Sequence, residues 1–393
     1  MTDYLIIRII DVHGKAVTFA AGAAQQTVDW PAATPQIGDV YKASITPVFI
    51  LHEKLAAGSA DIVWDRSDSL RWRKPLPDGQ TRMDVLAARH KIKRALRDYF
   101  DAEGFLEIDM PLLVRGTTPD AEVPSFRVED RYLVTSCEYQ IKRMEIGGFD
   151  KLYTLTQNFR AKDHGAYRNP EFTMLEYYRT EADMFVLMDD LDQMLNFIIK
   201  NCSGIFNFQF SIFKRISMKD LWQKTININL DEYLTREKMW ELCKEKKYNV
   251  ENPESYEELF YRIFLQEIEP KLKDMGVVIV YNYPAKMASL SKLSEINPNY
   301  AERFEVYIDG LELANAFSEL TNKDEQLKRL QEEQKERERQ GKKVYKIDME
   351  FIEAVGQMPN SAGIALGVDR LVQVLTSCQN IDSVLTLPSS KLF

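Results

Sequence analysis

The stretch NFRAKDHGAYRNPEFTMLEYYR, residues Asn158–Arg179, decides the fold. An apolar run that includes Leu152 and Leu155 leads into it, a polar loop rich in Gly, Asp, Arg and Asn follows, and the chain then returns as a second extended segment. This pattern predicts a β-hairpin with a long loop. Because side chains repeat every second residue along a strand, one face of the returning strand carries Phe172, Met174, Glu176 and Tyr178.

The hairpin carries opposite charges at its two ends. Arg160, Lys162 and Arg168 lie around the loop, and Arg160 leaves the first strand where its guanidinium could hold a phosphate by two hydrogen bonds. Glu176, in contrast, lies among large apolar neighbours, where a carboxylate is costly unless it meets a cation. The hairpin therefore predicts a site with an anion end and a cation end. The alternative is a surface hairpin with scattered charges.

A second hairpin, AERFEVYIDGLELANAFSEL, occupies residues Ala301–Leu320 and turns at Asp309 and Gly310. Glu305 and Glu312 lie on either side of this turn, so that they can face each other from paired strands. Two carboxylates in an apolar sheet repel each other unless a cation lies between them. Mg²⁺ bound together with a nucleotide is the natural partner for such a pair.

Two more segments frame these hairpins. Apolar residues at helical spacing follow Asp84 and predict a helix that ends at Gly104, and a short strand at Phe105–Ile108 follows, closed by Pro111. Near the C-terminus, residues Ala362–Leu371 read AGIALGVDRL, in which small residues let the backbone approach a nucleotide. Each of these segments alone also fits an ordinary core helix and strand.

In this order, the segments resemble motifs 1, 2 and 3 of the class II aminoacyl-tRNA synthetases. The version is the one carried by lysyl-tRNA synthetase and its short paralogue, the elongation factor P lysine ligase. The resemblance extends roughly from Met83 to the C-terminus. It implies the α+β fold class, with a class II synthetase-like antiparallel sheet flanked by helices, and motif 1 implies a homodimer. ATP and Mg²⁺ are the cofactors that it implies.

The same resemblance implies which residues bind ATP. Arg160 would hold the α-phosphate and Arg370 the γ-phosphate, and these two are the implied catalytic residues. Phe172 would stack on adenine, and Glu305 and Glu312 would bind the metal. The remaining implied ATP-binding residues are Lys162, Arg168, Asn169, Glu312, Leu313 and Gly367.

A pocket for a substrate with two ammonium groups, lysine or β-lysine, is also implied. Its implied residues are Ser136, Glu138, Glu176, Tyr178, Asn315, Phe317, Glu319 and Ala365. Lysyl-tRNA synthetase has glycine where this chain and the ligase have Ala365, and we expect the added methyl group to favour β-lysine. The alternative is that this methyl group only packs against a neighbouring strand. For Cys137, between two of these residues, the alternative to a structural role is a catalytic thiol.

The activity that the resemblance implies is ATP-dependent activation of lysine or (R)-β-lysine to the aminoacyl-adenylate, with transfer to a lysine side chain of elongation factor P. The ligase is favoured over the synthetase because the chain ends soon after motif 3 and its N-terminal segment is short and not basic. The alternatives are lysyl-tRNA synthetase-type aminoacylation, ligation to another acceptor, and a catalytically silent paralogue that acts as a binding protein. Lys162 and Ala316 keep the last alternative open, because the family has Glu and Gly there.

The composition bears on whether the protein binds nucleic acid and on the compartment in which we expect it. The net charge of −9, from 51 basic and 60 acidic residues, argues against a broad nucleic-acid surface and so against tRNA as a partner. The four cysteines form no C-x-x-C pair, which predicts reduced thiols in a cytoplasmic protein. No apolar run approaches the ~20 residues of a membrane span, and the N-terminus lacks the features of a signal peptide.

The organisation predicted along the chain is a small β-rich module with the start of a linker at 1–72, and a catalytic domain at 73–393. An OB-like barrel is one form that the module could take, and docking or support of a dimer is its expected role. In the catalytic domain we expect a helix at Asp183–Cys202 whose methionine-rich stripe packs in the core. Residues 203–275 are expected to be mostly helical, Val277–Tyr281 a buried strand, and the charged run from Lys323 a solvated helix.

Overall fold

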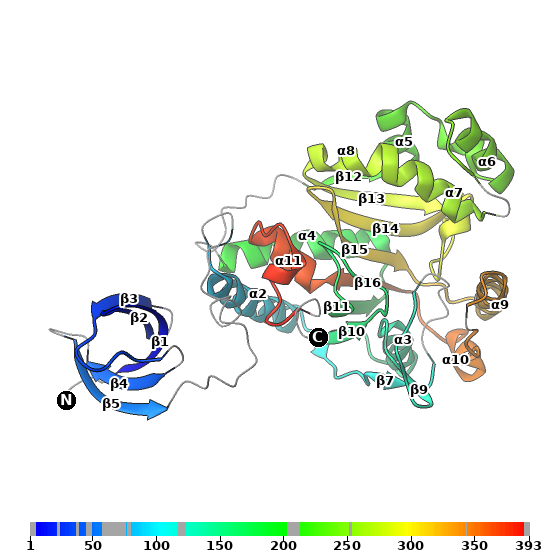
Figure 1. Cartoon of the computed structure of the whole chain (residues 1–393). Helices are drawn as coiled ribbons and strands as arrows, with labels where there is room; N and C mark the ends of the chain where they lie inside the picture. Colours follow the sequence, from blue (N-terminus) through cyan, green and yellow to red (C-terminus); the bar gives the residue numbers. More distant parts are fainter. Residues whose placement is uncertain are drawn as a thin grey trace. The chain divides into compact units, whose positions relative to one another are not determined.

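The computed structural model describes residues 5–21, 24–36, 39–44, 49–56, 76, 80–116, 123–202, 213–250, 254–342 and 344–388. The chain forms two compact units, Met1–Asp84 and Val85–Phe393 (Figure 1). The predicted boundary between residues 72 and 73 lies outside the described residues. Because each unit has its own hydrophobic core, we describe each by itself.

The first unit is a single antiparallel sheet with the strand order β3-β2-β1-β4-β5. Its strands are β1 (Leu5–His13), β2 (Ala16–Ala21), β3 (Ala24–Asp29), β4 (Val40–Ser44) and β5 (Ile50–Ala56). Ile7, Val17, Phe19, Trp30 and Ala43 are among the buried residues of its core. The prediction of a small β-rich module is confirmed, and the OB-like barrel stays a prediction.

The second unit is built on an eight-stranded sheet with the order β12-β13-β14-β15-β16-β11-β10-β6. Its strands are β6 (Leu106–Glu107), β10 (Lys151–Phe159), β11 (Glu171–Thr180), β12 (Lys214–Ser217), β13 (Val277–Pro284), β14 (Tyr300–Ile308), β15 (Leu311–Ser318) and β16 (Ser361–Gly367). A separate small sheet contains β7 (Leu113–Val114), β9 (Arg131–Leu133) and β8 (Arg127–Val128). The α+β class is therefore confirmed.

The large sheet is antiparallel in its centre and parallel at both ends. Strand β6 runs parallel to β10, and β12 runs parallel to β13. In both cases the connecting chain includes helices, the kind of crossover that a parallel pair requires. The predicted antiparallel sheet thus describes the six inner strands, and the two outer strands make the whole sheet mixed.

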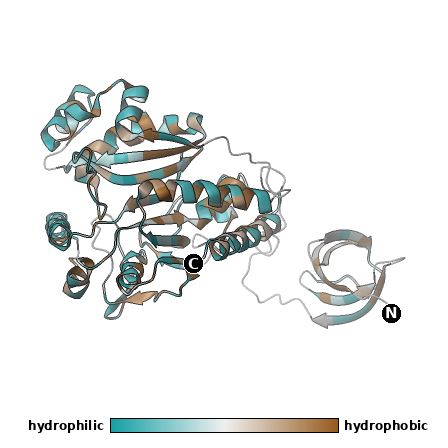
Figure 2. Ribbon diagram, turned by 180° about the vertical axis from the view of Figure 1, so that it is seen from behind, coloured by the Kyte–Doolittle hydropathy of each residue, from teal (hydrophilic) through white to brown (hydrophobic). Residues whose placement is uncertain are grey.

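Helices flank this sheet, as Figure 1 shows. They are α2 (Arg82–Ala102), α3 (Glu138–Ile146), α4 (Met184–Asn201), α9 (Lys323–Arg339), α10 (Met349–Val355) and α11 (Val368–Leu375). These helices are amphipathic, and Figure 2 shows both brown apolar residues and teal polar residues along them. The methionine-rich stripe of α4 is buried, as predicted, and the helix begins after Asp183, which caps its first turn.

The segment between β12 and β13 forms a helical insertion whose core is shared with strands β13 and β14. It contains α5 (Met218–Ile226), η1 (Leu230–Tyr233), α6 (Arg236–Glu245), α7 (Tyr256–Ile263), the π-helical turn η2 (Phe264–Ile268), α8 (Glu269–Leu272) and η3 (Lys273–Met275). Buried residues of this core include Trp222, Phe260 and Phe264. Two further short helices lie outside the insertion, η4 (Ala285–Met287) and η5 (Ile381–Ser383).

The two predicted hairpins provide the centre of the sheet. One is β10–β11, and the other is β14–β15, whose turn residues Asp309 and Gly310 have positive φ values of 50° and 80°. Strand β16 lies between the hairpins and pairs with β15 on one side and β11 on the other. Segments from three distant parts of the sequence therefore form adjacent strands, and their side chains meet on the face that carries the candidate site.

Candidate active site

A cavity of about 750 Å³ opens beside the central strands of the second unit. Its lining comes from the loop between β10 and β11, the start of α3, strands β15 and β16, helix α9 and the start of α11. A cleft of this size holds a nucleotide-sized ligand. The predicted site residues that line it are Arg160, Arg168, Asn169, Phe172, Glu312, Leu313, Gly367 and Arg370 for ATP, and Ser136, Glu138, Tyr178, Asn315, Phe317 and Ala365 for the amino acid.

Four predicted site residues do not line the cavity. Glu176 and Glu319 are buried behind its wall, and Glu305 is buried beside it. Lys162, one of the two positions at which this chain departs from the family, lies in the hairpin loop with its side chain exposed. It is not among the residues that line the cavity. Ala316, the second departure, is also buried and lies outside the lining.

Arg160 gives the cavity an unsatisfied donor. The residue follows β10, and its backbone is fixed because its N–H donates to the Pro170 carbonyl at 2.9 Å. The guanidinium lies over the Phe172 ring, with its Cζ 5.2 Å from the ring centre. Its Nε is buried and has no hydrogen-bond partner among the described residues. A buried donor without a partner is costly, so an acceptor from a ligand, such as a phosphate oxygen, fits this place.

Arg370 extends from the first turn of α11 into the same cavity. Its Nη1 donates to the Glu312 carbonyl at 2.7 Å, and its Nε donates to the Tyr167 carbonyl at 3.2 Å. These two bonds connect α11 to β15 and to the loop of the first hairpin. The guanidinium is thereby held on the wall of the cavity, at the edge where Arg168 is also exposed.

A buried ion pair behind Arg370 joins the three motifs. The Arg89 guanidinium, from α2, lies 2.5 Å from Asp369 Oδ1, and Thr173 of β11 donates its backbone N–H to Asp369 Oδ2 at 3.0 Å. Arg89 also donates to the Thr173 hydroxyl at 2.8 Å. Motif 1, motif 2 and motif 3 thus share one polar cluster, which fixes the position of the neighbouring Arg370.

Glu305 and Glu312 lie on one face of the second hairpin, but they are not directly opposite each other. Glu305 is paired with Asn315, and a bulge places Glu312 opposite Tyr307. Glu305 accepts from Arg303 Nη2 at 2.8 Å and from the Tyr307 hydroxyl at 2.6 Å. Burial raises the pKa of Glu305, and the negative charge of Glu312 raises it further. The positive charge of Arg303 lowers this pKa but does not cancel the rise.

These contacts decide which carboxylates could coordinate a metal ion at this end of the cavity. Within the part of the chain that the structure describes, no three His, Cys, Asp or Glu side chains gather as a metal site. Glu312 is the carboxylate of the pair that lines the cavity. Mg²⁺ that is bound with a nucleotide takes one or two carboxylates, with phosphate and water oxygens as its other ligands. The donor set therefore fits Mg²⁺ only as a companion of a bound nucleotide.

The other end of the cavity is rich in carboxylates. Glu176 accepts from the Ser136 hydroxyl at 3.1 and 3.0 Å and from the Cys137 backbone N–H at 2.7 Å. Burial raises its pKa to about 7, so this carboxyl takes up a proton near neutral pH. Burial also raises the pKa of the Cys137 thiol, which argues against the catalytic-thiol alternative.

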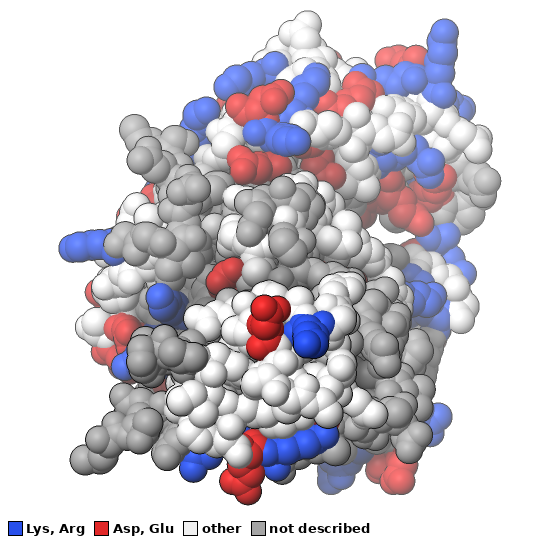
Figure 3. Space-filling model, turned by 60° about the vertical axis from the view of Figure 1, so that its left-hand side comes forward, with Lys and Arg blue, Asp and Glu red and all other residues white. Residues whose placement is uncertain are grey.

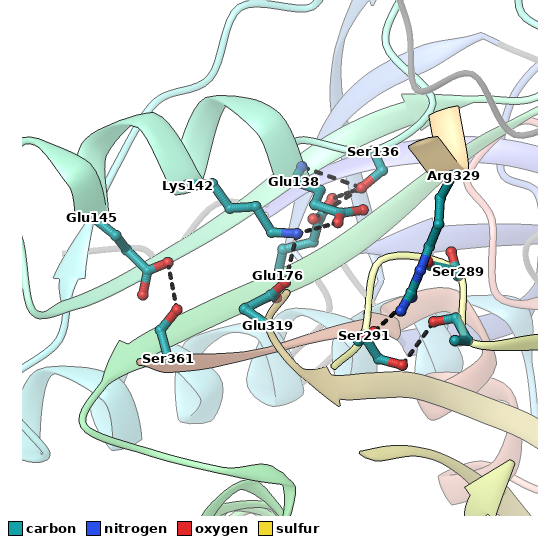
Figure 4. Close-up of polar contacts among 11 residues, drawn as sticks. Ser136, Glu138, Lys142, Glu145, Glu176, Ser289, Ser291, Glu319, Arg329 and Ser361 are labelled. Atoms are coloured by element: carbon teal, nitrogen blue, oxygen red, sulfur yellow. Dashed lines mark hydrogen bonds and ion pairs between the residues drawn. The ribbon is translucent and has the colours of Figure 1, made fainter. Parts of the chain in front are cut away.

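Lys142 was not predicted as a site residue, although it lies at the centre of this end. Its Nζ is 2.5 Å from Glu138 Oε1 and 2.5 Å from Glu319 Oε2 (Figure 4). The signal in the sequence is the four-residue spacing of Glu138 and Lys142, which places both on one helix face. Glu319 follows β15, more than 170 residues later in the numbering, and no local pattern connects it to this pair.

The wall between the two ends is formed by β11, β16 and β15. Ala365 lies between Glu176 and Asn315 in the register, and Gly363 lies between Tyr178 and Phe317. A Cβ added at Gly363 would come within 2.1 Å of the Tyr178 ring. Glycine here therefore admits the Tyr178 ring, whereas we expected the small residues of this strand to admit a nucleotide.

The remaining predicted ATP-binding residues differ in how they are held. Arg168 is 59% exposed, and its guanidinium lies 3.8 Å from Asp163 Oδ1. Asn169 is buried and donates to the Glu171 carbonyl at 2.5 Å. Leu313 is buried, and a Cβ added at Gly367, just before α11, would have the Arg370 side chain and the Leu313 carbonyl as its nearest neighbours, at 3.6 and 3.7 Å.

Comparisons with known proteins agree with this geometry. Residues 76–391 match the sequence model of the family described as tRNA synthetases class II (D, K and N). The chain is 32% identical over 336 residues to the elongation factor P–(R)-β-lysine ligase of Yersinia enterocolitica, covering 82% of this chain and 98% of that protein. It is 33% identical over 337 residues to the protein of the same name in Yersinia pestis, with the same coverage. No helix in the described ranges combines the length and apolar character that crossing a membrane requires.

Proposed function

Because the chain belongs to the class II tRNA synthetases (D, K and N), we propose that it activates lysine or (R)-β-lysine with ATP and transfers it to a lysine side chain of elongation factor P. The observation that carries this proposal is a single cavity with an unpaired guanidinium donor at one end and carboxylates at the other. The names of the relatives, elongation factor P–(R)-β-lysine ligases, support elongation factor P as the proposed acceptor.

The first half-reaction uses the phosphate end. An oxygen of the substrate carboxylate attacks the α-phosphorus, the bond to the β-phosphate bridging oxygen breaks, and pyrophosphate leaves. Arg160 would donate to the α-phosphate through the nitrogen that now lacks a partner, and Arg370 would meet the γ-phosphate. Preorganised cations lower such a barrier because they stabilise the charge that develops on the phosphate oxygens. Phe172 would stack on adenine.

Mg²⁺ fits this proposal at Glu312, with Glu305 behind it. When bound, the ion would neutralise charge on the phosphates of the nucleotide. Glu305 is held by Arg303 and Tyr307, so that its carboxylate has a fixed orientation before the nucleotide arrives.

The amino-acid end would recognise the two ammonium groups of the substrate. Glu138 presents a carboxylate on the cavity wall, and Tyr178, Asn315 and Phe317 form the walls beside it. Glu176 and Glu319 are buried behind these walls. A substrate with one ammonium group would leave part of this charge unpaired, and buried unpaired charge is costly.

The second half-reaction transfers the acyl group. The acceptor ε-amine attacks the carbonyl carbon of the adenylate, loses a proton, and AMP leaves. The reference pKa of a lysine amine is ~10.4, so the complex must supply a base or lower that pKa. In support of a protein acceptor over tRNA, basic and acidic side chains are interspersed over the helical insertion on the face shown in Figure 3.

Two further parts of the proposal concern assembly and location. We propose a homodimer through the region that resembles motif 1. In support, Leu106, Leu113 and Val128 expose 51%, 45% and 41% of their surface on β6, β7 and β8. A cytoplasmic location is supported by four free, buried cysteines, which fit a reducing compartment.

The decisive experiment measures amino-acid-dependent exchange of pyrophosphate into ATP, with α-lysine and (R)-β-lysine in parallel. Transfer to elongation factor P is then followed with radiolabelled substrate, and a factor whose acceptor lysine is replaced by arginine serves as the control. We expect exchange and protein labelling that the control factor lacks. Label that RNase removes would support the synthetase alternative, and no exchange with any amino acid would support the silent paralogue.

A further inference from the structure

Lys142 is a buried cation directly behind the amino-acid end of the cavity. Its side chain is 1% exposed, while the side chains of Glu138 and Glu319 are 14% and 0% exposed. Burial lowers the pKa of this ammonium, but the charges of Glu138 and Glu319 outweigh the effect and hold the pKa above its usual range. The Nζ also lies 5.5 Å from the centre of the Phe317 ring.

Each of the two carboxylates keeps one oxygen free. Lys142 occupies Oε1 of Glu138 and Oε2 of Glu319. Oε1 of Glu319 is buried and has no hydrogen-bond partner in the described part of the chain. Glu138 also lines the cavity. This unpaired oxygen leaves Lys142 as the cation that holds Glu319, while Glu138 presents its other oxygen to the cavity.

We propose that Lys142 is a positioning residue of the amino-acid pocket, which anchors Glu138 on the cavity wall through the contact that it shares with Glu319, so that the free oxygen of Glu138 meets one ammonium group of the substrate. The inference rests on the proposed function. Without a cation between them, two neighbouring carboxylates would repel each other, and one would take up a proton. With Lys142 between them, the two carboxyl groups lie side by side on one shared cation, and the pocket keeps acceptor oxygens for an ammonium group.

Figure 4 shows how the helix makes this arrangement possible. Lys142 and Glu138 project from neighbouring turns of α3, and Glu319, which follows β15, lies below the ammonium in this view. Glu145 lies one turn further along α3, near the same lysine. Burial raises the pKa of the Glu145 carboxyl, and the charge of Lys142 offsets only part of this rise. The Ser361 hydroxyl lies 3.3 Å from Glu145 Oε2 and holds this carboxyl away from the cavity.

The competing explanation is that Lys142 only neutralises Glu319 for stability. Removing one partner of a buried ion pair is destabilising by itself, so Lys142→Met alone does not separate the two explanations. The informative comparison is between Glu319→Gln and the double variant with Lys142→Met. In the Glu319→Gln background, removing Lys142 no longer leaves the Glu319 carboxylate without its partner, and Glu138 reaches the cavity.

The experiment measures KM for β-lysine and for ATP by pyrophosphate exchange in these variants, with calorimetric titration of β-lysine as a second readout. In the Glu319→Gln background, we expect Lys142→Met to raise the KM for β-lysine by about tenfold to hundredfold, the loss of a charged hydrogen bond, and to leave the KM for ATP unchanged. Arg143→Met is the matched control. It removes a cation from the next position of α3, paired with Asp348 at 2.5 Å outside the cavity.

Two results would overturn the inference. An active protein in which the double variant and Glu319→Gln have the same KM for β-lysine would show that Lys142 serves only to balance Glu319. A wild-type protein that neither exchanges nor binds either lysine isomer would overturn the proposed function and this inference together. The first result leaves the proposed function intact, so the two failures are distinguishable.

Discussion

At Arg160, a buried Nε without a partner in the described chain faces the cavity. We expect Arg160→Ala to lower the rate of adenylate formation by about 10²- to 10³-fold, the usual effect of losing one preorganised donor to a developing anion. Pyrophosphate exchange measures it, and circular dichroism checks that the fold is kept. Arg131→Ala, whose guanidinium is 38% exposed on β9, is the control. A wild-type rate in the Arg160 variant would remove this residue from the mechanism.

At Glu176, burial produces a pH dependence of stability. Because its pKa is raised to about 7, the stability that its protonated form contributes is present below the unfolded value of 4.5 and is lost as the pH rises through about 7. Glu176→Gln keeps the neutral form at every pH. We therefore expect the thermal midpoint of this variant, relative to wild type, to rise from pH 5 to pH 8.

The control for that measurement is Glu171→Gln, an exposed position on the same strand. Its difference from wild type should not change over the same pH range, because no charge is buried there. A Glu176→Gln difference that is equally flat would mean that the carboxyl is ionised throughout.

At Ala365, one methyl group lies on the cavity wall between Glu176 and Asn315. We expect wild type to prefer β-lysine and Ala365→Gly to shift the preference toward α-lysine. A difference of one methylene is worth ~1 to 3 kcal/mol of discrimination, so the shift changes a ratio and does not exclude an isomer. The measurement is kcat/KM for both isomers. Ala362→Gly, on the same strand but outside the lining, should leave the ratio unchanged.

The residues that the sequence did not indicate are those whose partners are distant. Glu138 and Glu176 could be assigned because they belong to recognisable motifs. Lys142 is a buried cation whose partner Glu319 lies far along the chain, and a sequence pattern does not tell which cation contacts which acid. We expected Glu319 to meet the substrate directly, whereas the structure adds Lys142 as its first neighbour.

At the scale of elements, strand β16 can pair with β11 beside the Tyr178 ring because Gly363 has no side chain. An added Cβ would lie 2.1 Å from the Tyr178 ring of the adjacent strand. We expect Gly363→Ala to destabilise the protein by ~1 to 3 kcal/mol, as overpacking does, and to raise the KM for the amino acid because Tyr178 is displaced. Chemical denaturation and exchange kinetics measure the two effects.

Gly356→Ala is the matched control, since the nearest atom to its Cβ would be in the flexible Lys323 side chain, at 3.4 Å, and the Glu353 carbonyl would lie at 3.8 Å. If Gly363→Ala left both the stability and the KM unchanged, the Tyr178 ring would have room to move away from β16. The contact would then not define the wall of the pocket.

Elements with strong local signals could be predicted from the sequence. Both hairpins have turn residues between extended segments, and α2 and α4 have apolar residues at helical spacing, so these four were found. The short strand predicted at Phe105–Ile108 is present as β6, whereas β12, a strand of four residues inside the range expected to be helical, was not predicted, and neither was the parallel direction of these two outer strands. Their direction depends on the crossover that precedes the partner strand, which is a property of the whole sheet.

At the scale of the whole molecule, every candidate site residue belongs to the second unit, and the first unit has its own core. The relatives from Yersinia enterocolitica and Yersinia pestis align over 98% of their lengths with 82% of this chain. We therefore expect deletion of residues 1–75 to leave lysine-dependent pyrophosphate exchange unchanged. Labelling of elongation factor P, measured in the same preparations, tests whether the first unit serves the acceptor. Loss of exchange in a folded truncated protein would contradict this prediction.

The ion pair of Arg89 with Asp369, and the bond from Thr173 to Asp369 across 196 residues, also bear on when the protein becomes competent during its synthesis. A ribosome adds residues in order, so helix α2 and the first hairpin emerge while Asp369 is still to be made. Until the last helix leaves the exit tunnel, Arg89 has no counter-ion there and Arg370 is missing. If Arg370 binds ATP as proposed, we expect a nascent chain not to consume ATP before translation is nearly finished, and a prematurely terminated product that lacks α11 to be inactive.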